Sequence, residues 1–145
     1  WPQFSDAVVD YYFNKKLAYH YIKRVQQPTC LMVSEPCGWD RKVMLDNASA
    51  FAAKGHWRVQ TCCGKTLTEG TFQAEPNSLI EVATLQISLA EHRLLLLDWQ
   101  EDQGTHGVNH YWAGSPPFSA KQYCEEYLSI LAGLDNSFKA TEIAR

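Results

Sequence analysis

Hydrophobic positions in residues 8–24 recur at helical spacing and form two stripes. One stripe repeats every four residues from Val9 to Tyr21, and a second, broader stripe is rich in tyrosine. A surface helix normally has a single apolar stripe, so two stripes predict a helix buried between two bodies. One body is the rest of this chain, and the other is an oligomer partner or another part of a larger protein. The side chains that we expect at this interface are Tyr12, Phe13, Leu17, Tyr19 and Tyr21.

Beyond Pro28 the pattern changes to the alternation that is typical of β-strands. Proline cannot continue a helix and restricts the residue before it, so the helix should end here. We expect strands over residues 29–35, 41–49, 56–61, 66–74, 83–89, 92–100 and 107–114. Seven short strands separated by turn residues favour a mainly β fold, an immunoglobulin-like β-sandwich.

Two tryptophans are expected in the core of this sandwich. Trp57 alternates with the polar residues Arg58 and Gln60, which places it on the inner face of its strand. Trp99 belongs to residues 92–100, which are apolar almost throughout, as in a central strand that is covered on both faces.

A second helix is expected near the C-terminus, with clear start signals. Ser119 is a suitable N-cap and Gln122 completes a capping box, while Phe118 and Tyr123 have the spacing of a hydrophobic staple. The helix has one apolar face, which we expect to pack on the sandwich, and Gly133 is expected to end it.

The five cysteines do not suggest a disulfide framework, because their number is odd. Cys62 and Cys63 are adjacent, and on a strand their side chains would point to opposite faces. We therefore expect buried free thiols.

Charge and hydropathy exclude two classes of partner. The chain has 145 residues, enough for one domain with a real core, and a net charge of -3. This charge gives no electrostatic footprint for nucleic acid. No apolar run has the length that a bilayer requires, so we expect neither a nucleic-acid nor a membrane partner.

No residue pattern indicates catalysis or a metal. His106 and His110 have a spacing seen in zinc sites, but the paired C-x₂-C motif is absent, so no metal or other cofactor is expected. Asp98, Glu101 and Asp102 are close in sequence, but we interpret them as a solvated loop at a strand end.

Sugar binding is a further hypothesis, carried by aromatic residues outside the expected core. Trp39 lies in a turn and Trp112 near the end of the last strand, and both are candidate contacts for an oligosaccharide. The chain would then be a carbohydrate-binding module. A third hypothesis is an autonomous interaction domain that dimerises through its first helix.

Two segments resemble glycoside hydrolase family 2, especially its β-mannosidase-like branch. "AVVDYYFNKKLAYHYIKRVQQP" is similar to the family's "VDYYGRPKAAYYYLKRxxxP", and "GVNHYWAGSPPFSAKQYCEEYLSIL" to its closing "GNHYLxGxPPFxxxxYxxWL". The matching positions of the first segment are Val9, Asp10, Tyr11, Tyr12, Lys15, Ala18, Tyr19, Tyr21, Lys23, Arg24 and Pro28. Those of the second are Asn109, His110, Tyr111, Gly114, Pro116, Pro117, Phe118, Tyr123 and Leu128.

The resemblance implies a division of the chain into two parts. Residues 1–27 would be the last helix of a catalytic (β/α)₈ barrel with its connection, and residues 28–145 the sandwich with its C-terminal helix. The family's catalytic glutamates lie on barrel strands upstream, so no residue of this chain inherits their role. The chain would be a non-catalytic accessory domain whose partner is the barrel of an exo-β-glycosidase such as a β-mannosidase. Such a parent would be secreted or periplasmic if it degrades polysaccharide.

One position departs from the family pattern. Asn14 stands where the family often has glycine or arginine, which leaves the subfamily and the substrate of the parent open.

Overall fold

The computed structural model describes residues 7–134, which divide into two compact units. Gln27–Ala120 forms one unit, and the described residues before Gln27 form the other together with those from Lys121 onward. The larger unit contains all seven strands, which makes the chain mainly β, as the sequence predicts.

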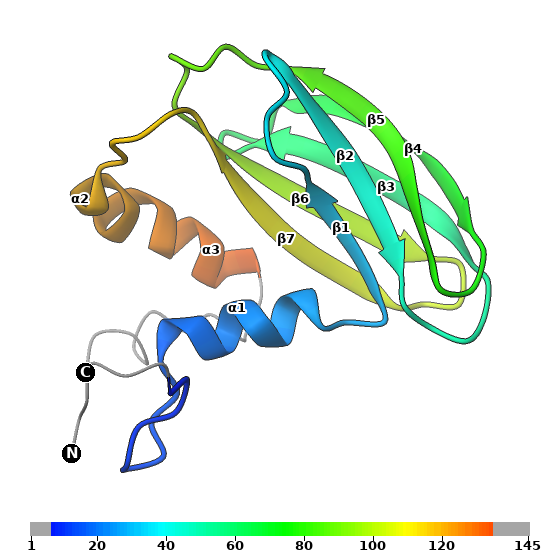
Figure 1. Ribbon diagram of the computed structural model, residues 1–145, viewed down its shortest axis with the longest axis horizontal. Helices are drawn as coiled ribbons and strands as arrows, with labels where there is room; N and C mark the ends of the chain where they lie inside the picture. The colour runs from blue at the N-terminus through cyan, green and yellow to red at the C-terminus, as the bar shows by residue number, and fades with distance from the viewer. Residues whose placement is uncertain (1–6, 135–145) are drawn as a thin grey trace. The chain divides into compact units, whose positions relative to one another are not determined.

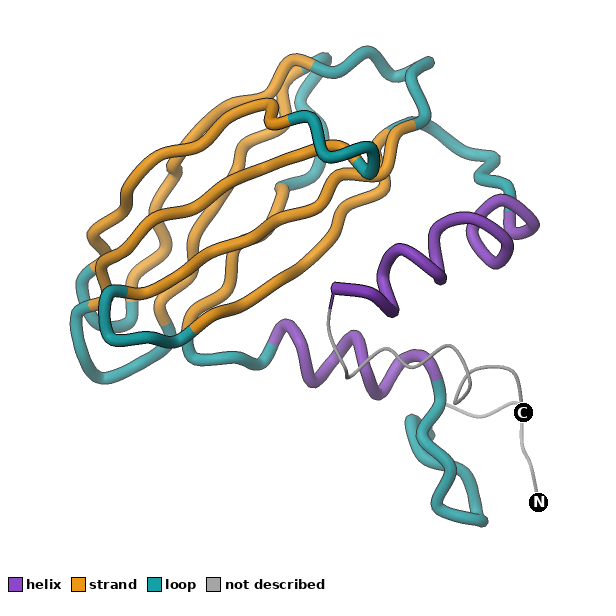
Figure 2. Tube along the Cα trace, turned by 180° about the vertical axis from the view of Figure 1, so that it is seen from behind, coloured by secondary structure: helices purple, strands orange, loops and turns teal. Residues whose placement is uncertain are grey.

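The larger unit is an immunoglobulin-like sandwich of two antiparallel sheets (Figure 1). One sheet has the order β1-β2-β5 and the other the order β4-β3-β6-β7. The connections β2–β3, β4–β5 and β5–β6 cross from one sheet to the other, and Figure 2 traces the strands of both layers. The strands are β1 (Thr29–Val33), β2 (Asp40–Asn47), β3 (Ala53–Thr61), β4 (Thr66–Ala74), β5 (Ser78–Gln86), β6 (Arg93–Glu101) and β7 (His106–Ala113).

The core lies between the two sheets and has two tryptophans at its centre. Trp57 on β3 and Trp99 on β6 are paired across the sheet and are both buried, which confirms the sequence prediction. Leu95 and Leu97 of β6 join this core, while Leu94 and Leu96 on the opposite face of the same strand are buried as well. Burial on both faces is the property that the apolar run of residues 92–100 predicts.

β5 spans Ser78–Gln86, so it begins and ends earlier than the strand over residues 83–89 that the sequence pattern predicts. The register between β2 and β5 shifts at Val43 and Met44, so Val82 has no partner and forms a bulge. A bulge reverses which alternate residues face inward. Ile80 before the bulge, Val82 at the bulge and Leu85 after it all pack on the core. The inward-facing positions therefore follow one alternation before Val82 and another after it, and the predicted strand over residues 83–89 covers only the second.

The predicted helix over residues 8–24 is wrong in its first half. Helix α1 spans Leu17–Val25, and the preceding residues form a tight loop closed by a bridge between Val9 and Lys15. The side chain of Asp10 accepts hydrogen bonds from the backbone N–H groups of Tyr12 and Asn14, each at 2.8 Å. Aspartate side chains that bond nearby backbone compete with helix formation in this way.

The C-terminal helical segment begins at the predicted place. α2 (Ala120–Gln122) starts directly after Ser119 and continues into a π-helical turn, η1 (Tyr123–Tyr127), and then α3 (Leu128–Leu134). Gly133 does not end the helix, because α3 runs through it to Leu134. The expected packing of both helices on the sandwich stays a prediction. Within residues 7–134, none of the helices has the length and apolarity that a bilayer-crossing segment needs.

Candidate functional site

Charged side chains meet on the outer face of the four-stranded sheet. Arg58 of β3 is paired with Glu69 of β4 on one side and with Asp98 of β6 on the other. Residues paired directly across antiparallel strands present their side chains on the same face. The register therefore places one guanidinium between two carboxylates in the middle of this face.

Asp98 hydrogen-bonds one neighbour and forms an ion pair with another at this position. Its Oδ2 lies 2.9 Å from Nε2 of His106 on β7, and its Oδ1 lies 3.8 Å from Nη2 of Arg58. The second distance is too long for a direct hydrogen bond, so the ion pair leaves donor capacity on the guanidinium. Nε of Arg58 is also buried and has no hydrogen-bond partner among the described residues.

A hollow of about 320 Å³ lies over this charged cluster. Trp57, which is buried in the core, and its strand neighbour Gly70 also line it. The charged side chains of Arg58, Glu69 and Asp98 supply both donors and acceptors to the hollow, beside apolar surface. Such a lining suits a neutral ligand with several hydroxyl groups, since carboxylates accept from hydroxyls and guanidinium donates to them. Its lining residues are His56, Trp57, Arg58, Glu69, Gly70 and Asp98.

The sequence interpretation of Asp98 as part of a solvated loop is wrong. Asp98 lies inside β6, three residues before the strand ends, whereas Asp102 lies in the following turn, with its carboxylate 3.6 Å from Lys54. Arg58 and Glu69 were not recognised as a pair. Their alternation marks them as outward-facing, but their proximity depends on the register between β3 and β4, which the sequence does not state.

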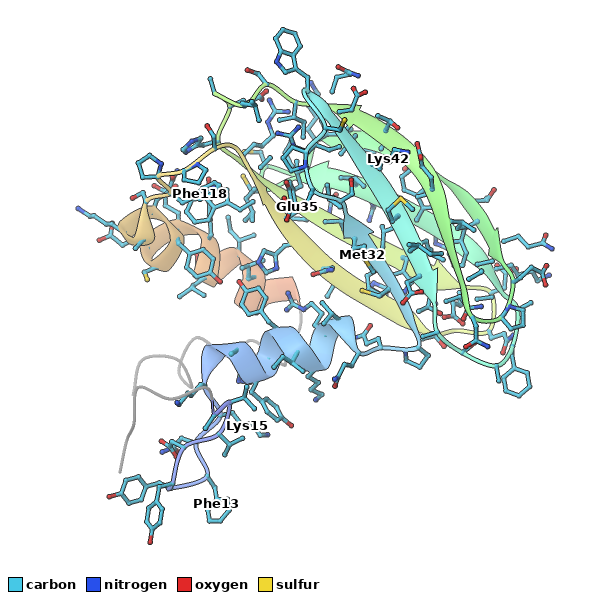
Figure 3. The ribbon with its side chains drawn as sticks, in the orientation of Figure 1. Phe13, Lys15, Met32, Glu35, Lys42 and Phe118 are labelled. Carbon is cyan, nitrogen blue, oxygen red and sulfur yellow. The ribbon has the colours of Figure 1, made fainter. Side chains whose placement is uncertain are left out.

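A second candidate surface is the loop before α1, which we call the aromatic loop: Tyr11, Tyr12 and Phe13. Their exposed fractions are 73%, 68% and 87%. Figure 3 shows Phe13 projecting from this loop. Soluble proteins rarely expose so much aromatic surface in one place, and where they do, the patch usually marks an interaction site.

The aromatic loop has a defined conformation. Asn14 donates to Oδ2 of Asp10 at 3.0 Å, in addition to the two backbone bonds that Oδ1 accepts. The side-chain bond from Asn14 is the main cause that lowers the pKa of Asp10 below its usual value. Phe13 has φ of +65°, a left-handed conformation that costs energy for a residue with a side chain.

The other predicted interface residues lie in α1. Tyr19 is half-buried, with the ammonium group of Lys15 5.0 Å from its ring centroid. Tyr21 is half-buried too, and its hydroxyl hydrogen-bonds that of Tyr123, while burial raises the pKa of both phenols. Leu17 is the first residue of α1, and its side chain lies outside the described set.

The two candidate sugar-contacting tryptophans have different environments. Trp39 is 66% exposed, and its carbonyl accepts a hydrogen bond from Ile87 N–H at 2.9 Å. Trp112 is half-buried and packs on Phe118, with the ring centroids 4.7 Å apart. Trp39 therefore offers a free aromatic face, whereas the ring of Trp112 is partly covered.

His106 and His110 lie on the outer face of β7, and His106 binds Asp98. Within residues 7–134, no three His, Cys, Asp or Glu side chains are close enough together to hold a metal ion.

No protein-family model matches this chain, and no curated protein matches it either.

Proposed function

We propose that this chain is the non-catalytic C-terminal accessory region of a family 2 glycoside hydrolase, in which it supports the catalytic barrel. The observation that carries the proposal is the exposed aromatic loop, which belongs to the segment that resembles the family's last barrel helix. Aromatic side chains dominate the energetics of protein interfaces because they bury much apolar surface at small entropic cost. The loop would contact the barrel of the parent enzyme, an exo-β-glycosidase such as a β-mannosidase.

The conformation of the loop supports this role. Three hydrogen bonds to Asp10 order the loop before any partner binds. Binding would therefore lose little conformational entropy in the loop. Phe13 keeps a left-handed backbone while its ring remains in solvent. Backbone strain of this kind is concentrated at functional sites.

The second resembling segment has a structural role that fits the proposal. Asn109 of β7 donates through its side-chain amide to the carbonyl of Leu31 on β1, at 3.0 Å. This bond joins the edge strands of the two sheets and is buried. Asn109 therefore has a structural role, since it links the two sheets of the sandwich.

The test is binding of this chain to a family 2 catalytic barrel that has been truncated before its last helix. Calorimetry should give a 1:1 complex, and the double variant Tyr12→Ser/Phe13→Ser should bind about tenfold to a hundredfold more weakly, because such residues act as hot spots. Trp39→Ser is the matched control, since it removes an equally exposed aromatic from the sandwich. Affinity that is unchanged in the double variant would overturn the proposal.

Self-association is tested in the same samples. A concentration-dependent dimer of the chain alone, lost in the double variant, would favour an autonomous interaction domain instead. Sedimentation of the chain across a hundredfold range of concentration measures this directly.

A second candidate function is carbohydrate binding, favoured by the polar hollow around Arg58 and Asp98. An NMR titration with manno-, galacto- and gluco-oligosaccharides should give saturable shifts on β3, β4 and β6 if the hollow binds sugar. Shifts confined to the turn around Trp39 would indicate stacking there, and no shifts at millimolar ligand would exclude this candidate. Arg58→Met is the matched variant, since it keeps the bulk of the side chain and removes its donors.

A further inference from the structure

Cys62 and Cys63 lie in the turn that joins β3 and β4. They do not lie on a strand, because β3 ends at Thr61, so the alternation of side chains between two faces does not apply to them. The expectation of buried thiols fails for this pair, since Cys63 is exposed and Cys62 is half-buried. Both thiols are free. Two adjacent free thiols are therefore accessible at the surface of this turn.

The turn holds the two cysteines in a fixed arrangement. Gly64 N–H donates to the carbonyl of Thr61 at 2.9 Å, and Thr61 N–H donates to the carbonyl of Lys65 at 2.9 Å. Gly64 has φ of +81°, the left-handed conformation that closes a three-residue hairpin loop. Cys62 and Cys63 therefore occupy the two central positions of a hydrogen-bonded turn.

The distance between the two sulfur atoms suits chelation of one atom. The Sγ atoms of Cys62 and Cys63 are 3.9 Å apart. Two bonds of about 2.3 Å at a tetrahedral angle place two sulfurs about 3.8 Å apart. A disulfide would require the sulfurs to approach to about 2.05 Å, which the turn would have to rearrange to allow. The existing geometry is therefore much closer to two sulfurs bound to one shared atom than to a disulfide. A pyramidal atom, whose bond angle is smaller than tetrahedral, would need the two sulfurs to move only slightly closer together.

The surroundings decide which kind of atom fits. A divalent metal needs deprotonated thiols and further ligands. Burial, with a further contribution from Cys63, raises the pKa of Cys62, and no third metal-ligating side chain joins the pair within residues 7–134. A trivalent arsenic atom that already carries one carbon substituent needs only two sulfurs, and it reacts with neutral thiols.

We propose that Cys62 and Cys63 form a bidentate binding site for monosubstituted trivalent arsenicals. In the step, R–As=O reacts with both thiols to form two As–S bonds. The oxygen leaves as water and takes both thiol protons with it. Arsenic and sulfur keep their oxidation states, so no oxidant or reductant is required.

The test is native mass spectrometry of the whole chain with phenylarsine oxide as the probe. A 1:1 adduct that persists in excess 2-mercaptoethanol and is removed by 2,3-dimercaptopropanol is expected. Persistence against a monothiol reports two simultaneous As–S bonds, whose effective concentration strengthens binding about a hundredfold or more over one bond.

Single variants separate this pair from the other thiols. Cys62→Ser and Cys63→Ser should each lose the monothiol-resistant adduct, whereas the matched controls Cys37→Ser and Cys124→Ser, which remove other exposed thiols, should keep it. Tryptophan fluorescence verifies that each variant is folded. The proposal would be overturned if 2-mercaptoethanol removes arsenic from the unmodified chain, or if either Cys62→Ser or Cys63→Ser retains the resistant adduct.

Discussion

The indole ring of Trp99 on β6 covers Gly107, its partner on β7. A Cβ atom on Gly107 would lie 2.1 Å from Cζ2 of Trp99, a separation that no packed structure tolerates. Trp57 and Gly70 repeat the arrangement between β3 and β4 with more room, at 3.2 Å. Each core tryptophan thus uses the space left by a glycine on the adjacent strand, and the two spaces differ in tightness.

Gly107→Ala should destabilise the sandwich severely. The added methyl group must displace the ring of Trp99 from a fully buried position, an overpacking cost of about 3 kcal/mol. Gly70→Ala is the matched control, and we expect it to cost about 1 kcal/mol or less, because its contacts need to yield by only a few tenths of an ångström. Urea unfolding followed by tryptophan fluorescence measures both. Equal midpoints for the two variants would contradict this ranking.

Asn47→Ala should cost about 2–4 kcal/mol of unfolding free energy, since it leaves several buried groups without partners. The Asn47 amide is fully buried and donates to the carbonyls of Phe51, Ala74 and Glu75, at 2.8, 3.3 and 3.0 Å. It thereby ties the β2–β3 connection to the β4–β5 turn. Gln73→Ala, an exposed change on β4, should cost less than about 0.5 kcal/mol. If Asn47→Ala lowers the unfolding free energy no more than Gln73→Ala does, the hydrogen bonds of Asn47 do not stabilise the link between these two connections.

The aromatic loop should remain ordered at neutral and mildly acidic pH and open only in strong acid. Hydrogen bonds from Asn14 lower the pKa of Asp10 below its usual value of 3.8. A lowered pKa means that the stabilisation is fully present above pH 3.8 and is lost as the pH falls through the lower folded value. Amide chemical shifts of Tyr12 and Asn14 against pH measure this. A midpoint above 3.8 would contradict the prediction, and Asp10→Asn should abolish the transition.

Lys42 and Glu81 should show opposite pKa shifts. Their side chains form an ion pair of 2.8 Å between β2 and β5, and both are partly exposed; Figure 3 labels Lys42 on β2. The bond to Lys42 lowers the pKa of Glu81, and the bond to Glu81 raises that of Lys42. The contribution of Glu81 is lost as the pH falls through its lowered pKa, and that of Lys42 as the pH rises through its raised pKa. Both effects on stability are small, because the pair is exposed.

NMR titration of the Glu81 carboxyl carbon provides the measurement. In Lys42→Met the pKa of Glu81 should rise toward its usual value but stay slightly below it, because Thr84 also donates to this carboxylate at 2.8 Å. An unchanged pKa in this variant would show that the ion pair does not form in solution.

Phe13→Gly should separate stability from function. Glycine adopts positive φ without the cost that Phe13 bears, so the variant should leave the loop equally or better ordered. The same change removes the aromatic ring that is most exposed within residues 7–134 and should weaken docking to a family 2 barrel by about tenfold. Amide exchange of Tyr12 reports the first effect and calorimetry the second. If Phe13→Gly binds the barrel as tightly as the unmodified chain does, Phe13 is not part of the interface.

Periodicity predicted the sandwich well, because most strands bury one face against a single core. Periodicity failed where a local feature changed which alternate residues face the core. The unpaired Val82 reverses the alternation within β5, and the pattern on either side of a bulge does not reveal that one strand continues through it.

The candidate sites were harder to predict, because they depend on side-chain bonds and register. Asp10 and Asn14 are four residues apart, a spacing compatible with a helix, and only their hydrogen bonds show that a loop forms instead. Arg58 and Asp98 are 40 positions apart in the chain and become neighbours through the pairing of β3 with β6. The distance between the thiols of Cys62 and Cys63 likewise depends on the turn that follows β3, which the sequence pattern alone does not specify.

The most direct test of the proposed docking is hydroxyl-radical footprinting of this chain with and without a family 2 barrel that lacks its last helix. Tyr11, Tyr12 and Phe13 are exposed in the chain alone and should react readily. We predict that adding the barrel protects these three rings several-fold and leaves Trp39, an equally exposed aromatic on the sandwich, unchanged. Equal reactivity of the three rings in the presence and absence of the barrel would contradict the account.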